Sequence, residues 1–472
     1  MRKTKIVCTL GPASNDENVI KNMLLAGMNV ARLNFSHGTH EEHSKTIDLF
    51  RSVRDKMELS AAVMLDTKGP EIRIKTFRDG EVTLKTGDRF TFTTEDVEGD
   101  CEKVSITYHD LPRQLEAGTK ILLDDGKLIF RVVSTTEKEI VCDIVFGGVL
   151  KNRKSINIPN VPIDMPYLSE ADKSDLLFGI EKDVDFVAAS FVRSAQDVID
   201  MRKFLDYNGG HNIKIISKIE NAQGVRAFDS ILRESDGIMV ARGDMGVEIA
   251  FEKLPGIQKR FIRRCYSSGK IVITATQMLE SIINSLTPTR AEISDVANAV
   301  FDGTSAVMLS GETAMGIDPA NVVSVMAKIA EQAESDALQM KAYSGYKYEV
   351  DAEDTTNAIC DAACTTARDL KAEAIIAVTN SGYTARLVSK FRPSETIVAA
   401  TPELKTYHQL SMSWGVVPVI ALNQTDTDRL FRHAIDCAKK IDAVKKGDTV
   451  VITGGVPLQI EGTTNTLKVE VI

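Results

Sequence analysis

The stretch that decides the fold spans residues 213–244 and reads IKIISKIENAQGVRAFDSILRESDGIMVARGD. Two short runs rich in β-branched and apolar residues, 213–220 and 237–241, flank a longer amphipathic segment. Continuous apolar runs of strand length are typical of strands buried on both faces, which occur in parallel sheets covered by helices. The stretch therefore predicts a strand–helix–strand unit, and both of its strands lead into charged residues.

The same unit recurs along the chain. Apolar runs of strand length, each followed by small or polar residues and then an amphipathic stretch, occupy residues 5–10, 28–35, 61–66, 186–191, 213–220, 237–241, 271–276 and 306–309. Eight strand–helix units make a (β/α)8 TIM barrel, in which the chemistry sits at the carboxyl ends of the strands. Nearly every run here ends in charged or hydroxyl side chains, so we expect the functional site at that rim.

Two regions do not belong to the barrel. Residues 70–165 alternate polar and apolar side chains between glycine-containing turns, which predicts an inserted all-β barrel that could act as a lid. Strand-like runs resume at 374–378, 396–400, 416–422, 449–452 and 466–471, which predicts a C-terminal α/β domain with an open sheet. The predicted domains are thus a barrel (1–69 and 166–345), a lid (70–165) and a C-terminal domain (346–472).

The composition narrows the class of protein. The 472 residues include 57 basic and 66 acidic side chains, a formal net charge of −9 that argues against nucleic-acid and membrane-surface partners. No apolar run is long enough to cross a membrane, and the first one is too short for a signal peptide. Seven scattered cysteines are typical of free thiols in a reducing compartment, so we expect a cytoplasmic protein.

One candidate site combines a lysine with two carboxylates. Lys218 and Glu220 are two residues apart in a strand and therefore point to the same face, and the next strand leads into Asp244. A glutamate and an aspartate from neighbouring strands offer hard oxygen ligands to Mg²⁺ or Mn²⁺. The alternative is an ion network that only holds the rim of the barrel together.

A second cluster lies on the strand at 28–35 and on its neighbour. Arg32, Asn34 and Ser36 alternate on one face, and Asp66 and Thr67 end the next strand. Amide, hydroxyl and carboxylate oxygens suit a monovalent or divalent cation, and the arginine fork suits phosphate. A plain hydrogen-bond network between strands would explain the same residues.

Two weaker signals concern hydroxyl groups. Thr276, Ser310 and Glu312 follow the last two barrel runs and could bind substrate or relay protons, although such residues usually cap the next helix. The C-terminal domain has a run of small polar residues between a strand and a helix, which predicts a phosphate-binding turn rather than an ordinary helix cap; its candidate residues are Thr379, Ser381, Gly382 and Thr384.

Six motifs together resemble one family. They are MNVARLNFSHG (28–38), LDTKGPEIR (65–73), ISKIEN (216–221), ARGD (241–244), ATQML (275–279) and MLSGETA (308–314). In this order they resemble pyruvate kinases, and the resemblance runs from the first strand to the C-terminus. It implies a barrel, a lid and an effector-binding C-terminal domain, usually in a homotetramer. The implied reaction moves the phosphoryl group of phosphoenolpyruvate to ADP, giving pyruvate and ATP in the last step of glycolysis, under allosteric control.

The resemblance also implies roles for individual residues. The implied divalent-metal ligands for Mg²⁺ or Mn²⁺ are Glu220 and Asp244, and the implied K⁺ ligands are Asn34, Ser36, Asp66 and Thr67. Lys218 would stabilise the transferring phosphoryl group, and the phosphate and nucleotide contacts would be Arg32, Arg73 and Lys154. The substrate carboxylate would lie against Thr276 and the backbone N–H groups of Gly243 and Asp244. Glu71 matches members that need K⁺, since members that do without it have lysine there.

Some features depart from the family or leave alternatives open. Ser155 and Asn160 stand where relatives usually have glycine, and the loop 454–457 lacks the Trp–Arg pair of members regulated by fructose 1,6-bisphosphate. The effector, a sugar phosphate or a nucleotide, is therefore open. An enolate-forming aldolase or lyase on a related barrel would have no use for the insertion and the K⁺ cluster. A non-catalytic sugar-phosphate sensor would be free to lose Lys218, Glu220 and Asp244.

Overall fold

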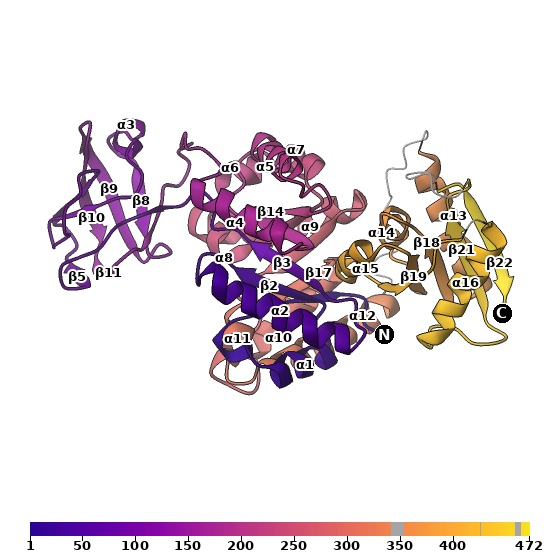
Figure 1. Cartoon of the computed structure of the whole chain (residues 1–472). Coiled ribbons are helices and arrows are strands. Elements are labelled where there is room, and N and C mark those ends of the chain that lie inside the picture. The colour runs from indigo at the N-terminus through magenta and orange to yellow at the C-terminus, as the bar shows by residue number, and fades with distance from the viewer. Residues whose placement is uncertain (341–353, 425, 458–463) are drawn as a thin grey trace.

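The computed structural model describes residues 1–340, 354–424, 426–457 and 464–472. Figure 1 shows three bodies in a row, with the inserted β-rich lid at one end, the barrel in the middle and the C-terminal α/β body at the other end. The chain enters and leaves the lid on the barrel's side, so the lid is attached by two neighbouring links.

The central body is a closed, all-parallel barrel with the strand order β1-β17-β16-β15-β14-β13-β3-β2. All eight predicted strands form, and their ends differ from the predicted runs by at most two residues. They are β1 (Lys5–Thr9), β2 (Val30–Asn34), β3 (Ala62–Asp66), β13 (Phe186–Ala189), β14 (Lys214–Ile219), β15 (Gly237–Ala241), β16 (Ile271–Ala275) and β17 (Ala306–Leu309). The apolar side chains are buried on both faces of these strands, one set inside the barrel and the other under the helices.

Helices surround the barrel, and several of them begin at a capping box, which fixes the residue at which the preceding loop ends and the helix starts. Thr39 with Glu42, Ser169 with Asp172, and Thr289 with Glu292 each satisfy the first free backbone N–H groups of a helix. The helices are α1 (Glu17–Ala26), α2 (His40–Lys56), α4 (Glu170–Glu181), α5 (Ala195–Tyr207), α6 (Ala222–Arg226), α7 (Phe228–Glu234), α8 (Arg242–Glu248), α9 (Leu254–Ser267), α10 (Arg290–Phe301), α11 (Gly311–Ala314) and α12 (Pro319–Gln339).

The lid is a curled sheet around an aromatic core. Seven strands pair in the order β4-β12-β8-β9-β10-β6-β7, and a bridge between Ile74 and Ile106 joins the two outer edges, so the sheet closes as the predicted small barrel. A separate two-stranded ribbon lies beside it. The strands are β4 (Ile72–Arg73), β6 (Arg89–Thr93), β7 (Lys103–Ser105), β8 (Lys120–Leu123), β9 (Leu128–Thr135), β10 (Glu139–Phe146) and β12 (Ser155–Asn157), with β5 (Glu81–Leu84) and β11 (Gly148–Lys151) in the ribbon; α3 (Leu111–Gln114) is a short helix.

The C-terminal body has the predicted five-stranded open sheet, in the order β20-β19-β18-β21-β22, with only β22 antiparallel. Separate apolar clusters lie on its two faces, so helices cover both. Its elements are α13 (Thr355–Leu370), β18 (Ala374–Val378), α14 (Tyr383–Lys390), β19 (Thr396–Thr401), α15 (Leu404–Gln409), β20 (Val416–Ile420), α16 (Thr427–Lys440), β21 (Thr449–Gly454) and β22 (Thr466–Val471). The boundary predicted at residues 345 and 346 lies outside the described residues.

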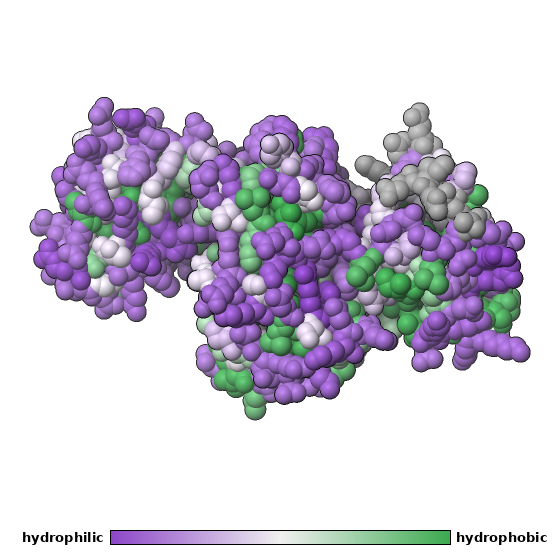
Figure 2. All heavy atoms as spheres, in the orientation of Figure 1, coloured by the Kyte–Doolittle hydropathy of each residue, from purple (hydrophilic) through white to green (hydrophobic). Residues whose placement is uncertain are grey.

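The surface seen in Figure 2 is mainly hydrophilic on all three bodies, with small apolar patches between. Over the part of the chain that the structure describes, none of the helices combines the length and the apolar character needed to span a bilayer. All seven cysteines are free thiols, as predicted, and six of them are buried.

Candidate active site

Lys218 is the centre of a buried polar cluster at the carboxyl ends of β14, β3 and β13. Its Nζ lies 3.0 Å from Asp66 Oδ1, 3.0 Å from Glu220 Oε1 and 2.7 Å from Ser190 Oγ. Burial alone would lower the pKa of Lys218, but the two carboxylates outweigh it and raise that pKa above its usual range. The structure therefore holds a permanently charged ammonium group at the rim, where sequence reasoning expected it.

The carboxylate of Glu220 has the properties of a cation ligand. Burial raises the pKa of Glu220 to about 8, Lys218 opposes this shift, and the nearby Asp244 carboxylate adds to it. Two carboxylates that repel each other in a dry site fit a divalent cation, and hard oxygen ligands fit Mg²⁺ or Mn²⁺. In the described ranges no three His, Cys, Asp or Glu side chains gather as a metal site, so such a cation would complete its shell with water or substrate oxygens.

The carboxylate of Asp66 accepts hydrogen bonds from two cationic side chains. The Nε of Arg32 lies 2.6 Å from Oδ2, opposite the Lys218 contact, and a second guanidinium nitrogen of Arg32 donates to Thr9 Oγ1 at 2.7 Å. Burial would raise the pKa of Asp66, but Arg32 and Lys218 outweigh it and lower that pKa. Two positive side chains thus converge on one carboxylate, which holds both of them in fixed positions at the rim.

The predicted K⁺ ligands lie together beside Asp66. Asn34 is the register partner of Asp66 on the neighbouring strand, and its side-chain oxygen accepts from the backbone N–H of Ser36 at 3.1 Å. Thr67 follows Asp66 directly, and its hydroxyl donates to the carbonyl oxygen of Ala188. Amide, hydroxyl and carboxylate oxygens therefore gather at one place, and this set of donors fits a K⁺ ion.

Thr276 sits in an unusual backbone conformation next to Gly243. Its φ is +67° and that of Gln277 is +53°, and its Oγ1 accepts from the backbone N–H of Gly243 at 2.8 Å. The guanidinium group of Arg242 donates to the carbonyl oxygens of Thr276 and Gln277 and pairs with Asp295 at 2.7 Å, which holds this strained turn in place. The structure thus brings Thr276, Gly243 and Asp244 to one edge of the site.

The two candidate proton-relay residues are close together but engaged with backbone groups. Both carboxylate oxygens of the buried Glu312 accept backbone N–H groups, from Ser310 at 2.6 Å and from Leu279 at 3.2 Å. This arrangement fixes the loop after β17. A role of Ser310 and Glu312 in proton transfer stays a prediction.

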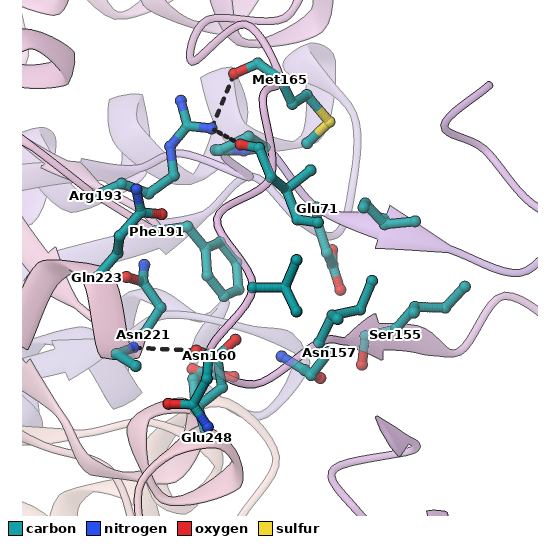
Figure 3. Close-up of a pocket in the computed structure, with 18 of the residues that line it drawn as sticks. Glu71, Ser155, Asn157, Asn160, Met165, Phe191, Arg193, Asn221, Gln223 and Glu248 are labelled. Carbon is teal, nitrogen blue, oxygen red and sulfur yellow. Dashed lines mark hydrogen bonds between the residues drawn. The ribbon is translucent and has the colours of Figure 1, made fainter. Parts of the chain in front are cut away.

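A groove separates the lid from this rim (Figure 3). Glu71 and Asn157 line it on the lid side, and Asn221, Asp244 and Glu248 line it on the barrel side. The groove therefore opens directly onto the predicted metal ligand Asp244, and it offers polar groups on both walls.

The structure does not bring the two predicted lid cations to the barrel cluster. Arg73 pairs with Glu71 at 2.7 Å and donates to the carbonyl oxygen of Arg153, while Lys154 pairs with Asp124 at 2.7 Å. Both residues stand on the lid, at β4 and just before β12. Their contact with a nucleotide stays a prediction.

The candidate residues of the C-terminal domain form a tight turn. Gly382, with a φ of +79°, caps α14, and its backbone N–H donates to Thr379 Oγ1 at 3.0 Å. Thr384 shares a hydrogen bond of 2.7 Å with Thr464, and the carbonyl oxygen of Ser381 accepts from Arg386. The four predicted residues lie between the end of β18 and the first turn of α14, in the C-terminal body (Figure 1).

Two functional neighbours were missed by sequence reasoning. Ser190 directly follows β13 and contacts Lys218, and Thr9 ends β1 and contacts Arg32. The only available signal was their position, because each is a hydroxyl residue where a barrel strand ends. That signal is weak, since such residues occur at many strand ends for capping.

Known proteins share this architecture and sequence. Residues 1–323 match the family model "Pyruvate kinase, barrel domain" and residues 357–470 match "Pyruvate kinase, alpha/beta domain". A pyruvate kinase of Clostridium acetobutylicum is 47% identical over the whole of both chains, and one of Staphylococcus haemolyticus is 48% identical over all of this chain and 81% of its own. The crystal structure of a pyruvate kinase from Cryptosporidium parvum superposes with a TM-score of 0.91 at 40% identity, covering 99% of this chain and 96% of that one.

These matches are consistent with the cluster of Lys218, Asp66 and Glu220 and leave no support for an aldolase, a lyase or a non-catalytic sensor. The chain is a phosphotransferase and belongs to the pyruvate kinase family.

Proposed function

We propose that this protein transfers the phosphoryl group of phosphoenolpyruvate to ADP at the barrel rim, with Mg²⁺ (or Mn²⁺) and K⁺, and so forms pyruvate and ATP as in the last step of glycolysis. The observation that carries the proposal is the buried contact of Lys218 with both Asp66 and Glu220. In the reaction the bond between phosphorus and the enol oxygen breaks, a bond to an oxygen of the ADP β-phosphate forms, and the enolate left behind takes up a proton.

Charge neutralisation explains the role of the cationic side chains. A migrating phosphoryl group carries negative charge on three oxygens and passes between two anions, so catalysis rests on positioned positive charge. Lys218 and Arg32 supply it, because both are buried and already held by Asp66. Their fixed positions mean that little reorganisation is needed when the phosphoryl group arrives.

The metal ligands and the substrate contacts complete the proposed site. Glu220 and Asp244 would hold the divalent cation, which when bound neutralises phosphate and enolate oxygens. Asn34, Ser36, Asp66 and Thr67 would hold K⁺. The substrate carboxylate would lie against Thr276 and the N–H groups of Gly243 and Asp244; in the present arrangement the Gly243 N–H donates to Thr276 Oγ1 at 2.8 Å, so these two groups already lie side by side.

The lid would supply the remaining contacts. Closure over the groove would bring Arg73 and Lys154 toward the nucleotide and exclude water from the transfer. The protonation of the enolate would use Thr276 and a water near Ser310 and Glu312. These roles rest on the family pattern; Arg73 and Lys154 also directly adjoin Ile72 and Ser155, which line the groove.

The assembly, the cellular location and the regulation of the protein are proposed as well. We infer a homotetramer in the cytoplasm, controlled by a sugar phosphate or a nucleotide bound at the turn that contains Thr379, Ser381, Gly382 and Thr384. The family match to both domains and the free thiols support these statements. Nothing in the charge of the chain favours a nucleic-acid or membrane partner.

The direct test is pyruvate formation from phosphoenolpyruvate and ADP in the presence of Mg²⁺ and K⁺, monitored with a coupled dehydrogenase assay. We expect turnover that disappears when the divalent cation is removed by a chelator and returns on adding Mg²⁺ or Mn²⁺. Absence of turnover under all these conditions would refute the proposed reaction.

A separate prediction concerns K⁺. Replacing K⁺ with tetramethylammonium at constant ionic strength should lower the rate at least about tenfold, because a bulky organic cation cannot fit among the small oxygen ligands. The variant Glu71→Lys, which puts a cation next to the site, should respond less to this replacement than the unaltered protein. An equal rate in both salts would contradict the K⁺ assignment.

A further inference from the structure

The turn after β13, residues 190–193, contacts two groups to which the proposed function assigns phosphoryl transfer and metal binding. Ser190 is almost completely buried, and its Oγ accepts from Lys218 Nζ at 2.7 Å. The same Oγ lies 2.6 Å from the carbonyl oxygen of Thr67 and 3.1 Å from Asp66 Oδ1. Since a hydroxyl has one proton to donate, it gives that proton to one of these oxygens and offers its lone pairs to Lys218. The orientation of the ammonium group is thereby fixed.

The next residue of this turn contacts Glu220. Phe191 has a φ of +54°, a conformation that bulky residues rarely adopt, and its backbone N–H donates to Glu220 Oε2 at 2.6 Å. The segment that leads from the barrel into the lid, which contains Gly69, packs directly on the same turn. A Cβ added at Gly69 would lie only 2.9 Å from the side chain and the carbonyl oxygen of Ser190. The surrounding structure thus holds a strained turn in the one shape that reaches both Lys218 and Glu220.

The end of the turn holds the second link of the lid, residues 158–168, here called the return linker. Arg193 donates from one nitrogen to the carbonyl oxygens of Ile163 at 3.1 Å and Met165 at 2.9 Å, as the dashed lines in Figure 3 show. Asp197 fixes the guanidinium group from behind with two contacts of 3.2 Å. A charged fork with a fixed partner is a firm anchor for two backbone oxygens.

The return linker is tied to the lid by the residue between these two. The backbone N–H of Asp164 donates to Gln114 Oε1 at 2.8 Å, and its carbonyl oxygen accepts from the Tyr108 hydroxyl. Alternate residues of the linker therefore bind the barrel and the lid. Closer to the barrel, the buried Tyr167 hydroxyl donates to the carbonyl oxygen of Ser190 at 3.0 Å, which connects the linker to the turn a second time.

We propose that residues 190–193 form a positioning element. It couples the position of the lid relative to the barrel to the orientation of the Lys218 and Glu220 side chains. Ser190 orients the ammonium group, Phe191 orients the carboxylate, and Arg193 holds the return linker. When the lid moves, the linker transmits the displacement to the turn and from there to both groups. Misplacement of such groups by about 1 Å is enough to lower a rate about 100-fold, so this coupling would limit fast transfer to the properly seated lid.

The first test removes the hydroxyl. Ser190→Ala should lower kcat about 10- to 100-fold and change the KM for phosphoenolpyruvate and ADP less than about threefold, because an interaction that acts on alignment affects the transition state more than ground-state binding. The matched control is Ser217→Ala, another buried serine on the neighbouring strand, whose hydroxyl bonds Ser235 at 2.7 Å. Its kcat should stay within about twofold. A normal kcat for Ser190→Ala would overturn the proposal.

The second test asks whether lid anchor and hydroxyl act together. Arg193→Met should lower kcat although Arg193 contacts no reacting atom, and the double variant with Ser190→Ala should lose clearly less than the product of the two single losses. Arg202→Met is the control, since Arg202 also donates to a backbone carbonyl, that of Ile213 at 2.9 Å, and pairs with Asp236. Should Arg193→Met fail to fold, Tyr167→Phe takes its place in the cycle.

The outcomes separate this inference from the proposed function on which it rests. If the unaltered protein and both controls turn over phosphoenolpyruvate and ADP but the two losses multiply, or only KM changes, the coupling is refuted and the proposed reaction stands. If the unaltered protein shows no turnover, the proposed function itself fails. Losses that combine to less than their product, with kcat affected and KM spared, support the coupling.

Discussion

Lys218→Met is expected to lose at least about 1000-fold in kcat while the chain keeps its fold, because the variant removes the positive charge around which the cluster is built. The ammonium group lies 3.0 Å from both Asp66 and Glu220, so it is placed to meet negative charge that develops on the phosphoryl group. Methionine keeps most of the length of the side chain and its apolar packing. The measurement is kcat in the coupled assay, with circular dichroism and thermal unfolding to confirm the fold.

The control for this variant is Lys214→Met, on the same strand β14. Lys214 lies at the other end of the barrel, with a side chain that is 30% exposed and paired with Asp236 at 3.4 Å. Its loss should leave kcat within about twofold, since an exposed ion pair contributes at most about 1 kcal/mol. A folded Lys218→Met variant with substantial turnover would disprove the role of the ammonium group in the transfer.

The loss of Lys218 also removes the positive charge that faces the buried carboxylates. Removing one partner of a comparable buried ion pair lowers the free energy of unfolding by roughly 3–5 kcal/mol. Arg32 still pairs with Asp66, so the main uncompensated group is Glu220. A bound divalent cation would offset its charge, and unfolding should therefore be followed with and without Mg²⁺. Greater stabilisation of the variant than of the unaltered protein by Mg²⁺ is the expected result.

The central features of the site could be predicted from the sequence because they follow from strand geometry. Lys218 and Glu220 share a face through the period of two, and Asn34 and Asp66, each at the carboxyl end of its strand, lie opposite each other on neighbouring parallel strands. The rule that barrel chemistry gathers at one rim then places these residues together. A structure with Lys218, Glu220 and Asp244 pointing into separate regions would have refuted this reasoning. Instead, Lys218 lies 3.0 Å from Glu220, and the Asp244 carboxylate is near enough to raise the pKa of Glu220.

Other parts could not be predicted, because they depend on contacts between distant segments. The importance of Ser190 comes from its contact with the side chain of Lys218, which is distant in the sequence. Nothing in the local sequence distinguishes Ser190 from a serine that only caps a helix. The backbone strain at Thr276 and Phe191 is imposed by Arg242 and by the lid links, not by local propensity. The orientation of Arg73 and Lys154 depends on where the lid sits, which no strand pattern encodes.

Glu220→Gln is expected to weaken Mn²⁺ binding at least about 100-fold, since even residues that only support a metal ligand cost 10- to 100-fold when replaced. Glutamine keeps the shape of the side chain and can still accept from the Phe191 N–H, but it lacks the negative charge that, together with the charge of Asp244, would attract the cation. Turnover should fall by about 1000-fold or more, because several kcal/mol of charge stabilisation depend on the bound cation. Binding is measured without substrate, by the electron paramagnetic resonance of free Mn²⁺, so this readout does not depend on activity.

The matched control for this prediction is Glu248→Gln. Glu248 lines the groove between the lid and the rim, burial likewise raises its pKa, and its carboxylate accepts from the Ala222 N–H at 3.0 Å. It resembles Glu220 in its backbone contact and in the direction of its pKa shift but is only partly buried and stands outside the Lys218 cluster, and its replacement should leave Mn²⁺ affinity within about threefold. If Glu248→Gln abolished Mn²⁺ binding and Glu220→Gln preserved it, the cation would belong to the lid-facing wall of the groove, and the assignment of Glu220 would be wrong.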